Sequence, residues 1–198
     1  MLLSVDSLET LEAELAAGRL RCPSCGRPLA PWGHARERDV RTLQGVRSLR
    51  PRRALCKPCQ TTRVLLPAWS VPRRRDGTEV ILSALVDAAR GAGHRTIARR
   101  LGRPQGTVRG WLRRARRGAG QLKHWATVSL YRFEPPDRGL DPRVPCTDAP
   151  LADAVQTLGQ AIGAAVRRHG PHGDPLQWAV VLTGGLIAGR PRDPPPVY

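Results

Sequence analysis

Two cysteine pairs with the same internal spacing are the residues of this sequence best suited to chemistry. They are Cys22-Pro23-Ser24-Cys25 and Cys56-Lys57-Pro58-Cys59. With two residues between its cysteines, each pair can form a tight turn that aims both sulfur atoms at one ion, and Gly26 can supply the positive φ that such turns favour. The sequence therefore predicts a tetrahedral zinc site with Cys22, Cys25, Cys56 and Cys59 as ligands. A redox-active dithiol and unlinked cysteines are the competing interpretations.

We expect this zinc to be structural rather than catalytic. Four thiolates fill a tetrahedral shell and leave no position for a catalytic water. His34 is the only histidine near the pairs, and it is not needed as a ligand. The fifth cysteine, Cys146, lies alone in a proline-rich segment and is expected to take no part in the site.

Residues 94–114, HRTIARRLGRPQGTVRGWLRR, have the residue types of a helix-turn-helix. Ala98 is small where two helices would meet, and Gly102 can end the first helix in the left-handed conformation. Val108 and Trp111 would pack the second helix onto the first. With an apolar helix before them, these segments predict three helices, the third of which is exposed for a DNA major groove. A purely structural helical hairpin is the alternative.

Charge favours DNA binding over the structural hairpin. No acidic residue occurs from 88 to 133, where arginine is abundant. By helical register, the residues predicted to face the bases are Gln105, Thr107, Arg109 and Arg113, with Gly106 and Gly110 allowing close approach. The residues predicted to bind phosphates are Arg95, Arg99, Arg103, Arg114 and Arg117.

A basic segment, residues 68–75, precedes these helices and ends in Arg73-Arg74-Arg75. Two prolines stiffen it, and the three arginines are predicted to hold phosphates or to enter a narrow minor groove. A solvated run of charge is the other interpretation.

The net charge of +17 is concentrated in the middle of the chain. Residues 21–123 hold 25 basic and 5 acidic residues, and the rest of the chain holds 8 basic and 11 acidic residues. This asymmetry predicts a polyanionic partner for the middle of the chain.

The acidic residues after Lys123 do not form a recognisable catalytic site. They are Glu134, Asp137, Asp141, Asp148, Asp153, Asp174 and Asp193. Two-metal chemistry requires carboxylates fixed on a folded sheet domain, whereas several of these lie in proline-rich loops and none lies in a strand-like apolar run. No serine or cysteine nucleophile has a matching base. We therefore expect no enzymatic activity from this chain.

The protein is expected to be cytoplasmic and nucleoid-associated. No basic, apolar leader is visible at the start, and the longest apolar stretch, residues 178–188, is too short to span a bilayer. In that compartment, cysteine pairs indicate metal binding more often than disulfides.

The fold class expected from these patterns is mainly α with a small β zinc ribbon. Within the ribbon, a hairpin is expected around Gln44-Gly45. The predicted order is an N-terminal helix (1–20), a four-cysteine zinc ribbon (21–67), a basic linker (68–75), a three-helix helix-turn-helix domain (76–118), a helical C-terminal region with a proline-rich loop (119–190) and a disordered tail (191–198). The C-terminal region is expected to form a helical pair, helices near 148–169 and 175–188, with a further helix near 121–133.

The order of zinc ribbon and helix-turn-helix resembles the N-terminal DNA-binding region of insertion-sequence transposases. It is still more similar to actinobacterial helix-turn-helix proteins of unknown function. The resemblance covers residues 20–117. It rests on the four cysteines, the basic segment 34–53, the segment 61–67, and the stretches 96–102 and 107–112. Transposases continue into a catalytic domain with three carboxylates, and here the sequence departs from them.

Sequence-specific binding of double-stranded DNA is therefore the predicted function, as a transcription regulator or a transposase-derived binding module. The C-terminal helices are the expected interface of a possible homodimer. A protein–protein adaptor that recruits a polymerase or a transposase is the alternative. RNA binding is less favoured, because Trp69, Trp111 and Trp125 are expected in the core, and no aromatic platform for single strands is apparent.

Overall fold

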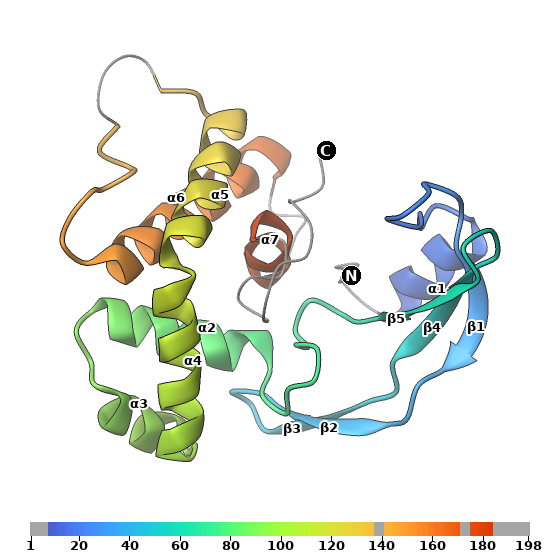
Figure 1. Cartoon of the computed structure of the whole chain (residues 1–198), viewed down its shortest axis with the longest axis horizontal. Coiled ribbons are helices and arrows are strands. Elements are labelled where there is room, and N and C mark those ends of the chain that lie inside the picture. Colours follow the sequence, from blue (N-terminus) through green and yellow to red (C-terminus); the bar gives the residue numbers. More distant parts are fainter. Residues whose placement is uncertain (1–7, 137–140, 171–174, 184–198) are drawn as a thin grey trace. The chain divides into compact units, whose positions relative to one another are not determined.

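The computed structural model describes residues 8–136, 141–170 and 175–183 of the chain. It divides the chain into two compact units, Met1–Gly77 and Thr78–Tyr198 (Figure 1). About half of the described residues are helical, and the strands all lie in the first unit. The expectation of helices together with a small β region around the cysteines is confirmed.

The first unit packs one helix against a small antiparallel sheet. Helix α1 (Leu8–Ala16) lies against three strands in the order β1 (Ala30–His34), β4 (Arg52–Cys56) and β5 (Thr61–Leu65). Period-two alternation in β4 buries Ala54 and Cys56, which face the same core as Leu11, Leu15 and Leu65. The cysteine pairs therefore lie at the edge of a packed apolar cluster.

A separate two-stranded hairpin completes this unit. Strands β2 (Arg38–Arg41) and β3 (Val46–Leu49) pair antiparallel, which confirms the hairpin expected around Gln44-Gly45. Thr42 follows β2 in the turn, where its hydroxyl donates to the Gly45 carbonyl (3.0 Å). Val40 and Leu49 pack with Leu66 and Trp69 in a second small core.

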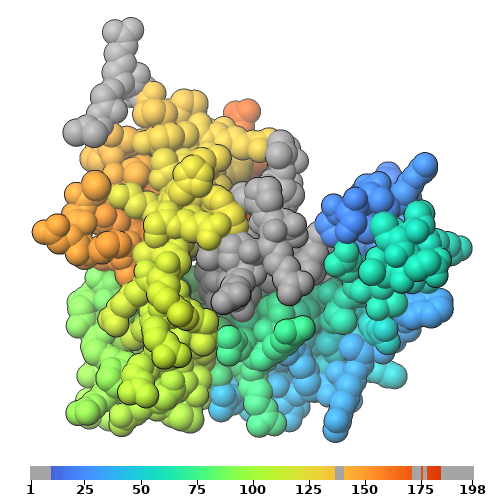
Figure 2. Space-filling view, viewed as in Figure 1, coloured from blue at the N-terminus to red at the C-terminus, as the bar shows by residue number. Residues whose placement is uncertain are grey.

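The second unit is entirely helical in its described part. Its helices are α2 (Thr78–Ala89), α3 (His94–Leu101), α4 (Gln105–Arg117), α5 (Ala119–Phe133), α6 (Pro150–His169) and α7 (Pro175–Leu182). Helix α2 contacts α3, α4, α6 and α7. Helix α5 continues roughly along the line of α4, and the side chains of the two form one continuous column on the face seen in Figure 2.

Alanine-rich faces bring α5 and α6 together. Ala126, Leu130, Ala154, Ala161 and Ala165 are all completely buried in one cluster. Small side chains let the two backbones approach closely, so the C-terminal helices share a core with the rest of the unit. Leu82 of α2 packs against the same cluster.

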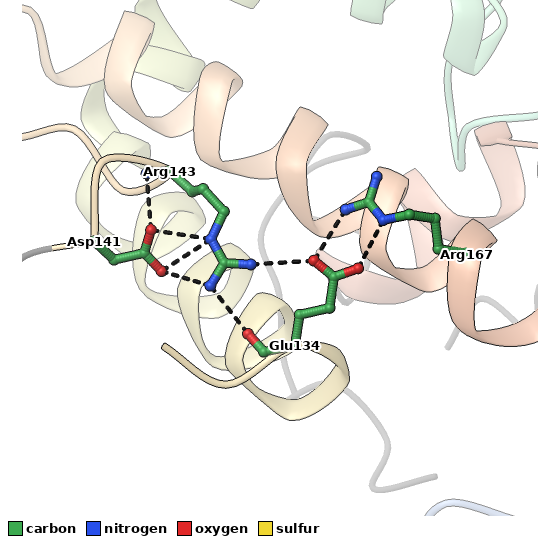
Figure 3. Close-up of polar contacts among 4 residues, drawn as sticks. All are labelled: Glu134, Asp141, Arg143 and Arg167. Carbon is green, nitrogen blue, oxygen red and sulfur yellow. Dashed lines mark hydrogen bonds and ion pairs between the residues drawn. The ribbon is translucent and has the colours of Figure 1, made fainter. Parts of the chain in front are cut away.

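An ion-pair network closes the loop that follows α5. Glu134 accepts from Arg167 of α6 at 2.7 and 3.0 Å, and Arg143 donates to Glu134 at 3.1 Å and to Asp141 at 2.8 Å (Figure 3). The Arg167 guanidinium lowers the pKa of Glu134, and Arg143 lowers the pKa of Asp141. The network ties the loop to the end of α6.

Two expectations about helix boundaries need correction. The helix expected to reach residue 20 ends at Ala16, because Leu20 pairs with Leu29 through a backbone hydrogen bond (2.8 Å) and enters the sheet core. Helix α4 ends at Arg117 with Gly118 at its C-cap, and α5 begins at Ala119, two residues before the helix expected near 121–133, because Ala119 is buried in the core shared with α6.

Some expectations fall outside the described residues. These are the start of the first helix before residue 8, the extension of the last helix from residue 184 to 188, and the tail 191–198. Among the helices of the described part, none is long and apolar enough to cross a membrane.

Candidate functional site

The four predicted cysteine ligands meet at one point of the first unit. The Sγ atoms of Cys22, Cys25, Cys56 and Cys59 all lie within 4.8 Å of one another. The Cys25 and Cys56 sulfur atoms are 3.4 Å apart, which is far longer than a disulfide bond. The cluster can therefore hold a metal ion, and the expected convergence of the two pairs is confirmed.

Each cysteine pair is held in its turn by the residue that follows it. Gly26 takes φ +69°, as its sequence position predicts, and its amide donates to the Cys22 carbonyl (2.8 Å). In the second turn the equivalent residue is Gln60, with φ +53°. A non-glycine residue is strained there, and its side-chain amide donates to the Lys57 carbonyl (2.6 Å), which stabilises the turn.

The electrostatics of the four thiols favour a bound cation. Backbone amides, chiefly that of Ser24, lower the pKa of Cys22 to about 6. Hydrogen bonds to the neighbouring cysteines, chiefly Cys25, together with burial, raise the pKa of Cys59 to about 12. One thiolate therefore forms readily and opposes the ionisation of the others, so a cation is needed for all four to be thiolates at neutral pH.

His34 and Cys146 lie apart from the cluster, as expected. His34 ends β1 with an exposed side chain, and Cys146 is exposed in the second unit. Among the described residues, neither belongs to a group that can hold a metal.

The connection between α3 and α4 is a short turn built on Gly102. That glycine takes φ +61° and ψ +40°, and the Arg103 amide donates to the Ala98 carbonyl (2.9 Å), closing the end of α3. Ala98 is 2% exposed where α3 and α4 contact each other. Val108 and Trp111 of α4 are buried as predicted.

The residues predicted to face bases lie along the outer side of α4. Gln105, Arg109 and Arg113 are exposed, and Thr107 is half-buried. A Cβ added to Gly106 would meet no atom within 4 Å, so the surface in front of it is open. This side of α4 is uncovered by other described parts of its own unit.

The residues predicted to bind phosphates fall into two groups. Arg95, Arg99 and Arg117 are exposed, and each is without an ion-pair partner in the part of the chain described here. Arg103 instead donates to the carbonyls of Leu101 and Gly102 (3.0 and 3.2 Å), and Arg114 is half-buried. The first group is the better placed for an outside ligand.

The arginine triplet 73–75 lines a cavity of about 690 Å³ in the first unit. Arg36 and Arg38 of the β2 side line it too, together with Glu37, Asp39 and Ser48. Sequence reasoning missed Arg36 and Arg38, because only the hairpin's contact with residues 70–77 brings them to the triplet. Burial lowers the pKa of Arg38.

One aromatic residue was also missed. Trp111 and Trp125 are buried as expected, and Trp69 is half-buried under Arg47, whose guanidinium lies 4.2 Å from its ring. Trp32 on β1, however, is 53% exposed. Its place between Pro31 and Gly33 was the sequence feature that could have indicated an exposed position, and β1 is indeed an edge strand.

Three of the acidic residues considered for catalysis take part in structural ion pairs. Glu134 and Asp141 belong to the network of Figure 3, and Asp153 accepts from Lys123 (3.4 Å) and from Thr147 (2.8 Å). Asp148 lies in the loop before α6. Asp137, Asp174 and Asp193 are outside the described residues.

Comparison with known families gives one match. A family model described as a domain of unknown function (DUF6431) matches residues 22–111, somewhat less than half of the chain. The matched range begins at the first cysteine of the cluster and ends within α4. A search of curated proteins and a search of solved structures found no match.

Proposed function

We propose that this protein binds double-stranded DNA sequence-specifically, with α4 as the helix that reads the bases in a major groove. The observation that carries the proposal is the outer side of α4, where Arg109 and Arg113 are exposed and have no ion-pair partner among the described residues. A helix inserted in the major groove needs such long donors, since arginine can bond guanine through two hydrogen bonds. Gly106 leaves room for close approach.

The three helices α2, α3 and α4 would act as a helix-turn-helix. Support comes from the left-handed Gly102 turn, the small Ala98 at the contact between α3 and α4, and the apolar residues of α2 buried behind them. In this arrangement α2 supports the pair, and Arg95 and Arg99 of α3 are placed to bind phosphates beside the groove.

Zinc is the metal that we propose for the cysteine cluster. Four thiolates around Zn²⁺ at about 2.3 Å imply sulfur–sulfur separations of roughly 3.8 Å. The cluster fits this shell, because its sulfur atoms lie within 4.8 Å of one another and the Cys25 and Cys56 sulfur atoms are 3.4 Å apart. Bound zinc would supply no chemistry beyond holding the two turns together, so the site would be a structural zinc ribbon.

The resemblance to transposase DNA-binding regions supports the same proposal. The family match covers the cysteines, α2, α3 and the first half of α4, which is consistent with these parts serving one purpose. We propose a transcription regulator or a transposase-derived binding module in the cytoplasm.

A protein–protein adaptor is the second candidate. Exposed apolar side chains in the first unit favour it: Trp32 is 53% exposed, Leu43 51% and Val46 65%. Aromatic residues such as Trp32 are enriched at protein interfaces. Salt separates the candidates, because a DNA binder that contacts several phosphates loses affinity steeply as salt rises.

Selection from a random double-stranded DNA library, with zinc-loaded full-length protein at moderate salt, tests the proposal. An enriched motif would support sequence-specific binding, and a two-fold symmetric motif would support a homodimer on DNA. Failure to enrich any motif, with folded protein that retains its metal, would reject the DNA proposal in favour of the adaptor.

A further inference from the structure

The cavity of the first unit brings together five arginines that are far apart in the sequence. Arg36 and Arg38 come from the β2 side, and Arg73, Arg74 and Arg75 come from the segment after the small core. Glu37 and Asp39 are the only carboxylates among the lining residues, so the lining carries an excess of positive charge. We call this cavity the arginine groove.

Arg38 holds the far wall of the arginine groove in place. Its half-buried guanidinium donates to the Ser70 hydroxyl (2.7 Å) and to the carbonyls of Val71 (3.1 Å) and Arg74 (3.0 Å). Three of its donors are therefore used inside the protein. Arg38 is a positioning residue and not a free ligand for an anion.

The segment after Arg74 is fixed to β2 by further bonds. The Arg41 amide donates to the Arg75 carbonyl (2.6 Å), and the Gly77 amide donates to the Arg41 carbonyl (2.9 Å). A Cβ on Gly77 would lie 2.9 Å from the Trp69 carbonyl oxygen, so only glycine fits this contact. The Arg41 guanidinium also bonds Asp76 (2.7 Å).

Three of the other four arginines of the groove are left for an outside partner, and the fourth, Arg74, is half-buried. Arg36, Arg73 and Arg75 are exposed, and within the described ranges none of them has an ion pair with a carboxylate. Glu37 accepts a short hydrogen bond from Ser48. Arg73 has φ +57°, a conformation that costs energy for a residue other than glycine. The hydrogen bonds of Arg38 to the carbonyls of Val71 and Arg74, which lie on either side of Arg73 in the chain, maintain it.

We propose that the arginine groove is a preformed phosphate-binding site for the backbone of duplex DNA, with Arg36, Arg73 and Arg75 as the contacting residues and Arg38 as the residue that positions them. This deepens the proposed DNA-binding function and rests on it. A guanidinium binds two oxygens of one phosphate at once, and a wall fixed before binding loses little conformational entropy on complex formation.

The contact is with phosphate and not with the bases. Among the described lining residues, the exposed donors without a partner are the guanidiniums of Arg36, Arg73 and Arg75, because the Ser48 hydroxyl is used by Glu37. Phosphate contacts add affinity equally on every sequence. The groove therefore strengthens binding without changing the preferred motif.

Binding of a short DNA duplex by the full-length, zinc-loaded protein tests the proposal, over a range of salt concentrations and on both a preferred and a scrambled sequence. The test variant is Arg73→Ala/Arg75→Ala. The control is Arg27→Ala/Arg50→Ala, which removes the same charge from exposed positions of the same unit outside the groove. Each lost phosphate contact should weaken binding roughly eightfold at 0.1 M salt and reduce the salt slope by about 1.

We expect the groove variant to weaken binding equally on both sequences and to flatten the salt dependence, while the control changes neither. Groove and control variants with the same salt slope would overturn this inference and leave base reading by α4 intact. A wild-type protein that binds no duplex would instead reject the proposed function itself. Groove-dependent binding to RNA but not to duplex DNA would also overturn the assignment.

Arg38 needs variants of its own. Arg38→Met should keep the melting temperature close to that of Arg38→Lys, yet lose the steep salt dependence of DNA binding that Arg73 and Arg75 provide. Equal salt slopes for wild type and for a folded Arg38→Met variant would remove its positioning role.

Discussion

Four sulfur atoms within 4.8 Å of one another cannot all ionise at neutral pH without a cation between them, because like charges repel at that distance. The same cluster buries Cys22 and Cys56 beside the apolar core of the first unit. Metal binding and folding of this unit are therefore expected to be coupled.

Cys56→Ser should abolish stoichiometric metal binding and unfold the first unit. Cys56 is 0% exposed, and a serine hydroxyl is a poor replacement for a thiolate as the ligand of a metal such as zinc. Metal analysis of the purified protein, together with a thermal melt, measures both effects. Cys146→Ser is the matched control, since that cysteine is exposed and outside the cluster, and it should change neither quantity. Full metal content in Cys56→Ser would remove Cys56 from the ligand set.

Arg109→Ala should weaken binding to the preferred DNA site by about 1–3 kcal/mol and relax the preference at one base pair. The side chain is exposed on α4 and carries no helix-stabilising ion pair in the described structure, so folding should be unaffected. Affinities on a set of single-base variants of the site give the measurement. Arg99→Ala on α3 serves as the comparison, with a uniform loss expected. A uniform loss for Arg109→Ala as well would make it a phosphate contact.

At the scale of elements, the turn between α3 and α4 depends on one backbone conformation. Gly102 and Gly106 both have open space where a Cβ would go, and they differ in that Gly102 has φ +61°. Gly102→Ala should therefore destabilise the second unit by roughly 1–2 kcal/mol through strain alone. Gly106→Ala should be neutral or stabilise it by up to about 1 kcal/mol, because alanine favours a helix.

In Gly106→Ala, DNA affinity should fall even though the stability of the second unit does not. A methyl group at residue 106 lies on the side of α4 proposed to approach the bases, so Gly106→Ala should weaken DNA binding despite its stability. Urea denaturation and DNA titration of both variants make the comparison. If Gly106→Ala binds DNA as tightly as wild type, a different side of α4 must face the DNA major groove.

The connection of α5 with α6 should be sensitive to acid. Hydrogen bonds from Thr147, with the charge of Lys123, lower the pKa of Asp153. The unfolded chain then binds a proton before the folded one does, so the stabilisation is complete above the ordinary carboxyl pKa of about 4 and is lost as pH falls through the lower folded value. Thermal unfolding, followed by the helical circular dichroism signal at pH values from 7 downwards, should show this loss of stability. The Asp153→Asn variant should have a lower melting temperature at pH 7, and that temperature should change less with pH than in wild type. A variant with the same pH dependence as wild type would contradict this role of Asp153.

At the scale of the whole molecule, the chain has two compact units with separate cores. A chelator should therefore unfold the first unit and leave the helices of the second in place. Far-ultraviolet circular dichroism should retain most of its helical signal, whereas the environment of Trp32 and Trp69 should change in fluorescence. A single cooperative loss of all structure on chelation would show that the units depend on each other.

Much of the candidate site was predictable because its signals are local. The two-residue spacing in each cysteine pair, Gly26 and Gly102 at their turns, and the apolar period of Ile97, Leu101 and Val108 each act within a few residues. Helix ends were less predictable. Ala119 is buried in the core shared with α6, so α5 begins directly after the break at Gly118 and not near residue 121.

The sequence by itself determined that four cysteines of matched spacing would converge, that a basic helix would follow a glycine turn, and that positive charge would gather in the middle of the chain. Only the tertiary structure decided which arginines are available. Arg103 is turned onto nearby carbonyls, and Arg38 is used to hold residues 70–74, more than thirty positions away. The charge of an arginine follows from its side chain alone, whereas a partner such as Ser70 for Arg38 is set by long-range packing that no local pattern encodes.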